Sequence, residues 1–116
     1  RMIFDCTPLY VQILEQIEDE ICTGKWQEGK RLPSVSELAH QFKVAPQTVS
    51  HSLHLLVQRG ILKPKRGIGM VICAGSVQRL KQKKLAAFLS LVYRARKEVQ
   101  LLQIGREEIF AMLKRN

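Results

Sequence analysis

The chain is 116 residues long and 46% hydrophobic, which suffices for one compact domain, or for one small domain with an appendage. Its formal net charge is +9, and it has no run of about eighteen apolar residues, so the composition predicts no transmembrane helix and no membrane partner. The opening apolar run, RMIFDC, is too short for a signal peptide. The cysteines Cys6, Cys22 and Cys73 are odd in number and lack CxxC spacing, which favours reduced thiols in a cytoplasm over disulfides or zinc.

Acidic and basic residues are unevenly distributed along the chain. Seven of the ten acids lie in the first 37 residues, whereas the window Leu38–Lys97 contains no Asp or Glu. That window holds twelve Lys and Arg and all three His. Such a region suits a polyanionic partner, and nucleic acid is the leading candidate. Charge alone leaves open a soluble protein with basic surfaces.

The first predicted helix follows Thr7-Pro8, with Thr7 as the N-cap and Pro8 at the first helical position. Apolar residues then recur at helical spacing, namely Tyr10, Ile13, Leu14, Ile17 and Ile21. Gly24 is the expected end of this helix.

A second helix is predicted after Pro33, which favours an extended Leu32 and therefore a very short strand. Ser34 and Glu37 have the spacing of a capping box, in which each satisfies the other's backbone N–H. The expected inward side of this helix carries Val35, Leu38, Ala39 and Phe42. Lys43-Val44 then makes a tight turn.

The third predicted helix starts at Pro46, which suits the first helical position, and ends at Gly60. Its expected buried side carries Val49, Leu53, Leu56 and Val57. Ala45 is a poor N-cap residue. This indicates that the residue at position 45 is determined by something other than helix stability. Two short helices around a tight turn are typical of a helix-turn-helix.

A β-hairpin is predicted next, with strands Ile61–Lys63 and Met70–Ile72 around the tip Lys65–Gly69. Gly67 and Gly69 let the tip turn tightly and come close to another backbone. Because the tip is basic and no acid lies near it in sequence, the helix-turn-helix and the hairpin together favour a nucleic-acid partner.

From Ser76 onward we predict one long helix, which Gly105 breaks before a short last helix. Apolar residues repeat along the long helix at spacings of three and four, namely Leu85, Phe88, Val92, Ala95, Val99 and Leu102. A small domain offers little surface to cover such a stripe. Self-association is therefore favoured over folding back on the same chain.

Several stretches fall in a familiar order without a gap: PLYVQILEQIEDEI, GKWQEGKRLPSVSELA, VAPQTV, LVQRGIL and RGIG. Over about Pro8–Ile72 they resemble the GntR family of bacterial winged-helix repressors. Only about 45 residues follow, and they are helical in pattern. That arrangement resembles the small YtrA-type subfamily, where two helices after the winged domain form the dimer. The resemblance implies a mainly α fold with a small β-hairpin, with a winged helix-turn-helix DNA-binding domain at residues 1–75 and a helical dimerisation region at residues 76–116.

The resemblance also implies where double-stranded DNA is contacted. The third helix is expected to enter the major groove with its N-terminal residues at base edges. Its expected contacts are Pro46, Gln47, Thr48, Ser50 and His51. Ser34 and Ser36 are suited to hold phosphate through hydroxyl and backbone N–H groups. In the hairpin the expected contacts with phosphate or the minor groove are Lys65, Arg66, Gly67 and Gly69.

The chain departs from the family pattern at two of these positions. Family members commonly carry Arg where Ser36 stands, and often where Ser50 stands. Arginine reads guanine through paired hydrogen bonds, so its absence predicts an operator that is less G-rich or bound more weakly.

Other functions have weaker support. His51 and His54 are three apart on one helix, but His40 belongs to another helix and no acid is in reach by sequence, which disfavours a metal site. The chain has no paired carboxylates and no phosphate loop, so we expect no enzyme. An adaptor that binds RNA or a protein partner remains the alternative, because both arginine anchors are absent.

The sequence thus predicts a homodimeric bacterial transcription regulator, acting as a repressor at a palindromic operator, with no metal or organic cofactor. A small-molecule effector is left open, because the sequence defines no pocket for one.

Overall fold

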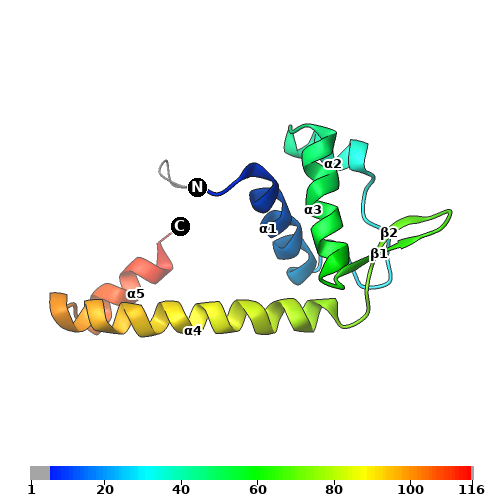
Figure 1. Cartoon of the computed structure of the whole chain (residues 1–116). Coiled ribbons are helices and arrows are strands. Elements are labelled where there is room, and N and C mark those ends of the chain that lie inside the picture. The colour runs from blue at the N-terminus through cyan, green and yellow to red at the C-terminus, as the bar shows by residue number, and fades with distance from the viewer. Residues whose placement is uncertain (1–5, 116) are drawn as a thin grey trace. The chain divides into compact units, whose positions relative to one another are not determined.

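The structure, a computed structural model, describes residues 6–115 (Figure 1). Over these residues its elements are α1 (Leu9–Cys22), α2 (Val35–Phe42), α3 (Pro46–Gln58), β1 (Leu62–Lys65), β2 (Gly69–Ile72), α4 (Ser76–Leu102) and α5 (Arg106–Lys114). The predicted mainly α fold with a small β-hairpin is confirmed. The chain divides into two compact units within α4, after Lys81.

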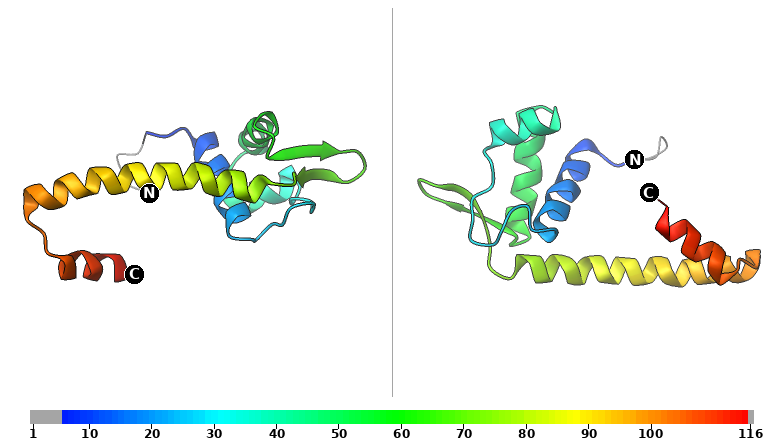
Figure 2. Two further views of the ribbon diagram at one scale, coloured as in Figure 1. Left: turned by 90° about the horizontal axis from the view of Figure 1, so that it is seen from below. Right: turned by 180° about the vertical axis from the view of Figure 1, so that it is seen from behind.

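The core of the first unit is built around α3, which contacts α1, α2 and β1. Figures 1 and 2 show α1 and α2 beside α3, with the hairpin extending away from the helices. Ile17, Leu38 and Leu56 each have a relative exposure of 0%. Burying a side chain of this size stabilises the fold by about 1.5–3 kcal/mol. The inward residues predicted for the three helices are all buried or half-buried.

Helix α1 begins one residue later than the sequence predicted, because Pro8 and not Thr7 is its N-cap. Pro8 has an extended ψ of 148°, and its carbonyl accepts hydrogen bonds from the backbone N–H groups of Val11 and Gln12. The side chain of Gln12 also donates to the Thr7 carbonyl at 2.8 Å. The missing N–H of proline costs nothing here, because N–H groups at a helix start have no partner within the helix.

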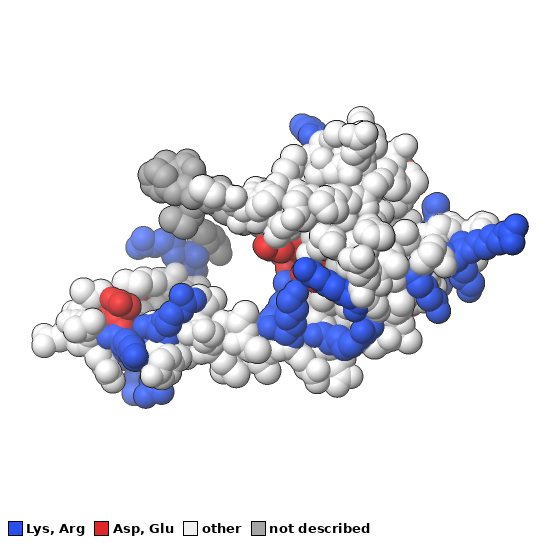
Figure 3. Space-filling model, in the orientation of Figure 1, with Lys and Arg blue, Asp and Glu red and all other residues white. Residues whose placement is uncertain are grey.

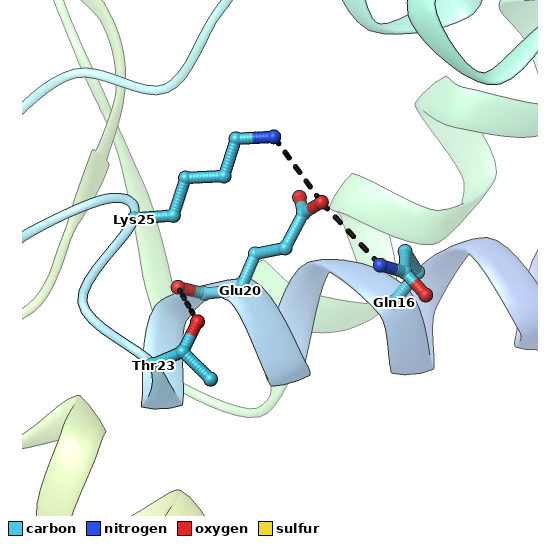
Figure 4. A network of polar contacts seen from close by, with 4 residues as sticks. All are labelled: Gln16, Glu20, Thr23 and Lys25. Atoms are coloured by element: carbon cyan, nitrogen blue, oxygen red, sulfur yellow. Dashed lines mark hydrogen bonds and ion pairs between the residues drawn. The ribbon is translucent and has the colours of Figure 1, made fainter. Parts of the chain in front are cut away.

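Glu20 fixes the chain where α1 ends (Figure 4). Its carboxylate accepts hydrogen bonds from Gln16 Nε2 at 3.4 Å and from Lys25 Nζ at 3.3 Å. Its backbone carbonyl accepts one from Thr23 Oγ1 at 3.2 Å. Gly24, the predicted end of the helix, follows with a positive φ of 86°. These contacts hold Thr23 and Lys25 against the end of α1.

The capping box predicted at the start of α2 is confirmed. The Glu37 N–H donates to Ser34 Oγ at 3.1 Å, and the Ser34 N–H donates to Glu37 Oε1 at 3.0 Å. Hydrogen bonds from the Ser34 backbone and side chain lower the pKa of Glu37, with a smaller contribution from the positive charge of Arg31. At the other end of α2, Lys43 adopts a left-handed φ of 57° in the tight turn.

The hairpin strands lie closer to the tip than predicted. The ladder runs from Leu62 opposite Ile72 to Lys65 opposite Gly69, so only residues 66–68 connect the strands. Ile61 was predicted to open the first strand but lies outside the ladder. Its carbonyl instead accepts hydrogen bonds from the Cys73 N–H at 2.9 Å and from Ser76 Oγ at 3.0 Å.

The segment just before α2 runs along the free side of β2. Gly29 N–H donates to the Ile72 carbonyl at 2.8 Å, and Leu32 N–H donates to the Met70 carbonyl at 2.8 Å. The very short strand predicted near Leu32 is present as a single antiparallel bridge between Arg31 and Val71. The segment is therefore held at the base of the hairpin.

The start of α4 belongs to the core of the first unit. Leu80 is 3% exposed. The Glu28 carboxylate accepts hydrogen bonds from the N–H groups of Gly75 at 2.8 Å and Val77 at 3.0 Å, and these bonds lower its pKa. Arg79 donates to the Gly60 carbonyl at 2.6 Å. The compact unit thus extends past the boundary predicted at residue 75.

The second unit contains the remainder of α4 and α5. The predicted break between the long helix and the short last helix is present and contains Gly105, but α4 already ends at Leu102, where Gln103 takes a left-handed φ of 54°. Gly105 is instead the N-cap of α5, with an ordinary φ of −78°. The Ile104 N–H bonds to the Val99 carbonyl at 3.2 Å and closes the last turn of α4. Across residues 6–115, no helix combines the length and apolarity needed to cross a bilayer.

Candidate nucleic-acid interface

Helix α3 presents a continuous polar face to the surroundings. Gln47, His51 and His54 are exposed and follow one another at spacings of four and three, so they lie on one side of the helix. Val49 and Leu56 are buried on the opposite side. His54 is not among the residues that the sequence predicts to contact DNA, but its spacing of three from His51 places it on the same exposed face.

The other residues predicted to contact DNA on α3 occupy two different settings. Pro46 stands at the first helical position, as predicted, and is exposed together with Ser50. Thr48 is half-buried, and its carbonyl accepts a hydrogen bond from the buried Ser52 Oγ at 3.0 Å. Ala45 makes no side-chain cap hydrogen bond. The start of α3 therefore leaves its first turn open to a partner.

His51 is held by α1. Its ring stacks on that of Tyr10, with 4.0 Å between ring centroids and an interplanar angle of 21°. Beside this stack, Ser52 Oγ donates to the Tyr10 backbone carbonyl at 2.6 Å. These two contacts fix α3 on α1 and restrict the orientation of an exposed ring on the polar face.

At the start of α2, Ser34 and Ser36 are both exposed. The Ser34 oxygen accepts a hydrogen bond within the capping box, which leaves its hydroxyl hydrogen to donate elsewhere. The Glu37 carboxylate also lies at this helix start, where it accepts the Ser34 N–H. A phosphate approaching here would therefore meet one acid among the donors.

The hairpin tip carries its charge without a nearby acid. Lys65, Arg66, Gly67 and Gly69 are all exposed. Figure 3 shows basic side chains gathered at the projecting end of the hairpin, where no acidic side chain is visible. Gly67 and Gly69 have φ values of 80° and 123°, conformations that other residues rarely adopt. The prediction that glycines make this tight turn possible is confirmed.

A groove of about 400 Å³ lies between the hairpin and the start of α2. It brings together the predicted contacts Ser34, Lys65, Arg66 and Gly69, and it adds Arg31, which no sequence pattern singled out. A second groove of about 420 Å³ reaches Ser50 and His54 on α3. The two grooves share a mainly apolar lining of Val35, Leu53, Pro64 and Met70. Ser36, Gln47 and His51 line neither groove.

Metal binding receives no support from the described residues. Within residues 6–115, no three His, Cys, Asp or Glu side chains come close enough together to hold a metal ion. The two histidines considered for such a site differ in setting, because His51 is stacked on Tyr10 whereas His54 lies at the second groove.

Residues 9–72 match the family described as bacterial regulatory proteins, gntR family. The chain is 34% identical over 96 residues to YhcF of Bacillus subtilis, an uncharacterized HTH-type transcriptional regulator, with 81% of this chain and 79% of YhcF covered. It is 35% identical over 79 residues to the HTH-type transcriptional repressor YtrA of the same organism, with 68% and 61% covered. The chain is also 38% identical over 65 residues to the repressor NagR, and this alignment covers only 27% of NagR.

Solved structures show the same relationship. A GntR family transcriptional regulator from Listeria monocytogenes matches with a TM-score of 0.72 and 31% identity, covering 95% of this chain and 96% of that one. AraR(DBD), solved in complex with operator ORR3, matches with a TM-score of 0.56 and 30% identity, covering 60% and 83%. The resemblance drawn from the sequence is confirmed, and the chain belongs to the gntR family of bacterial regulatory proteins.

Proposed function

We propose that the chain is a DNA-binding transcriptional repressor that recognises a palindromic operator as a homodimer. The observation that carries the proposal is the exposed polar face of α3 flanked by a basic, acid-free hairpin tip, within a family of transcription regulators. The similarity to AraR(DBD), which was solved with operator DNA, supports the duplex as the partner. The repressor assignment rests on the similarity to YtrA and NagR.

In this proposal α3 reads bases in the major groove. Gln47 is the principal reader, because its amide can donate to and accept from adenine at the same time. Ser50 and His51 lie beside it on the exposed surface. Thr48, being half-buried, is better placed for the DNA backbone at the start of the helix. Pro46 sets where that start lies.

The remaining contacts position the protein on the duplex. Lys65 and Arg66 neutralise phosphate or enter the minor groove, and Gly67 and Gly69 let the hairpin backbone approach. Ser34 and Ser36 donate to phosphate at the start of α2. Phosphate contacts set register and affinity but carry no base information directly, so sequence preference falls mainly to α3.

The dimer in this proposal forms through α4. The predicted seam is uncovered in the single chain, where Leu85 is 54%, Phe88 57% and Val92 38% exposed. Ala95 and Leu102 are also exposed, and Val99 is half-buried. Leu89 and Leu91, 57% and 55% exposed, flank the seam. A second copy of the chain would cover this stripe, and two-fold symmetry in the protein implies two-fold symmetry in the operator.

The proposal requires no enzyme activity, metal or organic cofactor, and it places the protein in a bacterial cytoplasm, where its DNA is. An effector is also not required. The three thiols form no disulfide among the described residues, as suits a reducing compartment.

The proposal is tested by gel shift with duplex DNA from upstream of the chain's own coding region, a shuffled duplex and an RNA of equal length. A repressor should stay bound to the upstream duplex at moderate salt, where the shuffled duplex and the RNA dissociate. It should also reduce expression of a reporter gene placed downstream of that duplex. Retention of RNA but not DNA would instead support the adaptor. A complex formed with neither would point to a protein partner.

A further inference from the structure

Arg31 stands at the base of the hairpin on a segment with a fixed backbone. The bridge to Val71 pairs it with β2, and the hydrogen bonds from Gly29 and Leu32 hold its neighbours on the same strand. Arg31 itself is exposed. Its Cα is therefore positioned by the hairpin, while its side chain remains accessible.

The Arg31 side chain lies over the hairpin backbone at Gly69. A methyl group added at Gly69 would sit 3.4 Å from Arg31 Cδ and 3.5 Å from Cγ. The aliphatic part of the Arg31 side chain thus lies at van der Waals distance from the position that a Cβ at residue 69 would take. Among residues 6–115, no hydrogen bond or ion pair involves the Arg31 guanidinium, whose charge contributes only weakly to the lowered pKa of Glu37. Within the described part of the chain, the aliphatic portion of Arg31 is therefore packed, whereas its guanidinium is available to a ligand.

Three cations share the groove between the hairpin and α2. Arg31 lines it together with Lys65 and Arg66, and its remaining lining is mostly apolar, including Pro64 and Met70. A DNA strand combines these two characters, because its phosphates are anionic and its deoxyribose carbons are apolar. Because the three cations are exposed at an open groove, a ligand that supplies negative charge can pair with them through charge-assisted hydrogen bonds.

We propose that Arg31 is a third phosphate-binding cation of the winged domain, which with Lys65 and Arg66 holds one DNA strand in this groove. The inference rests on the proposed DNA-binding function and adds to it a contact outside the helix-turn-helix and the hairpin tip. The planar guanidinium can donate two parallel hydrogen bonds to one phosphate. The contact is made to the DNA backbone and not to a base.

The test compares Arg31→Ala with Lys30→Ala in the full chain. Lys30 is the matched control, because it is the adjacent cation on the same extended segment, is also exposed and does not line the groove. Affinity for operator DNA is measured by fluorescence anisotropy between about 50 and 200 mM salt. Removing the cation that binds one phosphate makes the slope of log affinity against log salt shallower by about 0.9.

For a homodimer, Arg31→Ala should make that slope shallower by about 1.8, so the loss of affinity across this salt range becomes about tenfold smaller. Affinity for operator and random duplexes should fall by the same factor. Lys30→Ala should leave the slope unchanged, and Arg31→Lys should restore most of it because the charge is kept. Circular dichroism and thermal unfolding establish that each variant is folded.

A folded Arg31→Ala variant with the slope of Lys30→Ala would overturn the assignment. A changed base preference would also overturn it, because the contact would then be to a base. Failure of the proposed function itself looks different, since the unaltered chain would then show no salt-dependent affinity for any duplex.

Discussion

Tyr10 of α1 and His51 of α3 form a stacked pair, with 4.0 Å between their ring centroids, on the face that we assign to DNA. The pair links the start of α1 to the polar face of α3. Ser52, the residue after His51, donates to the Tyr10 carbonyl and so fixes the backbone beneath the stack. An exposed His51 is thus held in one orientation by a residue forty-one positions earlier in the sequence.

The first prediction concerns this stack. Tyr10→Ala and His51→Ala should each destabilise the fold, and the pair should show a coupling of about 0.5–1.5 kcal/mol in a double-mutant cycle measured by urea unfolding. Tyr10→Phe keeps the ring and is the control, so its coupling should be retained. The Ser52 hydrogen bond goes to the backbone and survives all of these changes. Strictly additive effects would mean that the stack contributes no energy.

The second prediction concerns base recognition by Gln47. Gln47→Ala should remove a contact worth about 1–3 kcal/mol of discrimination, so base preference should flatten at one position of each half-site. Affinity for random duplexes should stay nearly the same. The measurement is binding to a panel of single-base operator variants.

His54→Ala provides the comparison for that experiment, because His54 lies farther along the same exposed face. It should leave the preference at the Gln47 position intact. If Gln47→Ala weakens binding to every duplex equally, Gln47 is a backbone contact, and specificity must come from Ser50, His51 or DNA shape.

The third prediction concerns the α4 seam. Replacing Leu85 and Val92 together with Asp places charges in an apolar interface and should yield monomers. Both residues lie outside the compact winged unit, so its unfolding midpoint should persist while operator binding falls sharply. Light scattering measures the molar mass of the variant and of the unaltered chain in solution. A monomeric unaltered chain at micromolar concentration would show that the seam is not a dimer interface.

The fourth prediction concerns acid stability. The pKa of Glu28 is lowered from its ordinary value of 4.5, chiefly by the N–H groups of Gly75 and Val77. Its contribution is therefore fully present above that value and is lost as pH falls through the lowered pKa. Glu28→Gln should lower Tm at neutral pH, and its difference from the unaltered chain should shrink below about pH 4.5. A difference independent of pH would contradict this role for the carboxylate.

The sequence was sufficient to predict local structure where residues close together in the chain form each other's hydrogen bonds or fix a helix start. Ser34 and Glu37 form the predicted capping box, and Pro46 opens α3 as predicted. The period of apolar residues likewise identified the buried sides of the helices, because each side faces one common core. The DNA-binding role that we propose for the hairpin rests on its basic tip and on the resemblance to the family.

Contacts between distant segments were not predictable in this way. The stack of Tyr10 on His51 and the position of Arg31 beside Gly69 depend on how α1 and residues 29–32 pack, which no local pattern encodes. The end of α4 was also not predictable from the sequence. Gln103 takes a left-handed conformation that is more usual for glycine, so α4 ends before Gly105, the residue that the glycine pattern indicated.

The most direct test of the central claim is selection of duplexes bound by the full chain from a random pool at moderate salt. We predict enrichment of a two-fold symmetric sequence, with half-site centres about one helical turn of DNA, or a multiple of it, apart. The same selection with Gln47→Ala should lose information at one position in each half. Recovery of duplexes without a common sequence, or of a single asymmetric half-site, would contradict a homodimer that reads a palindromic operator.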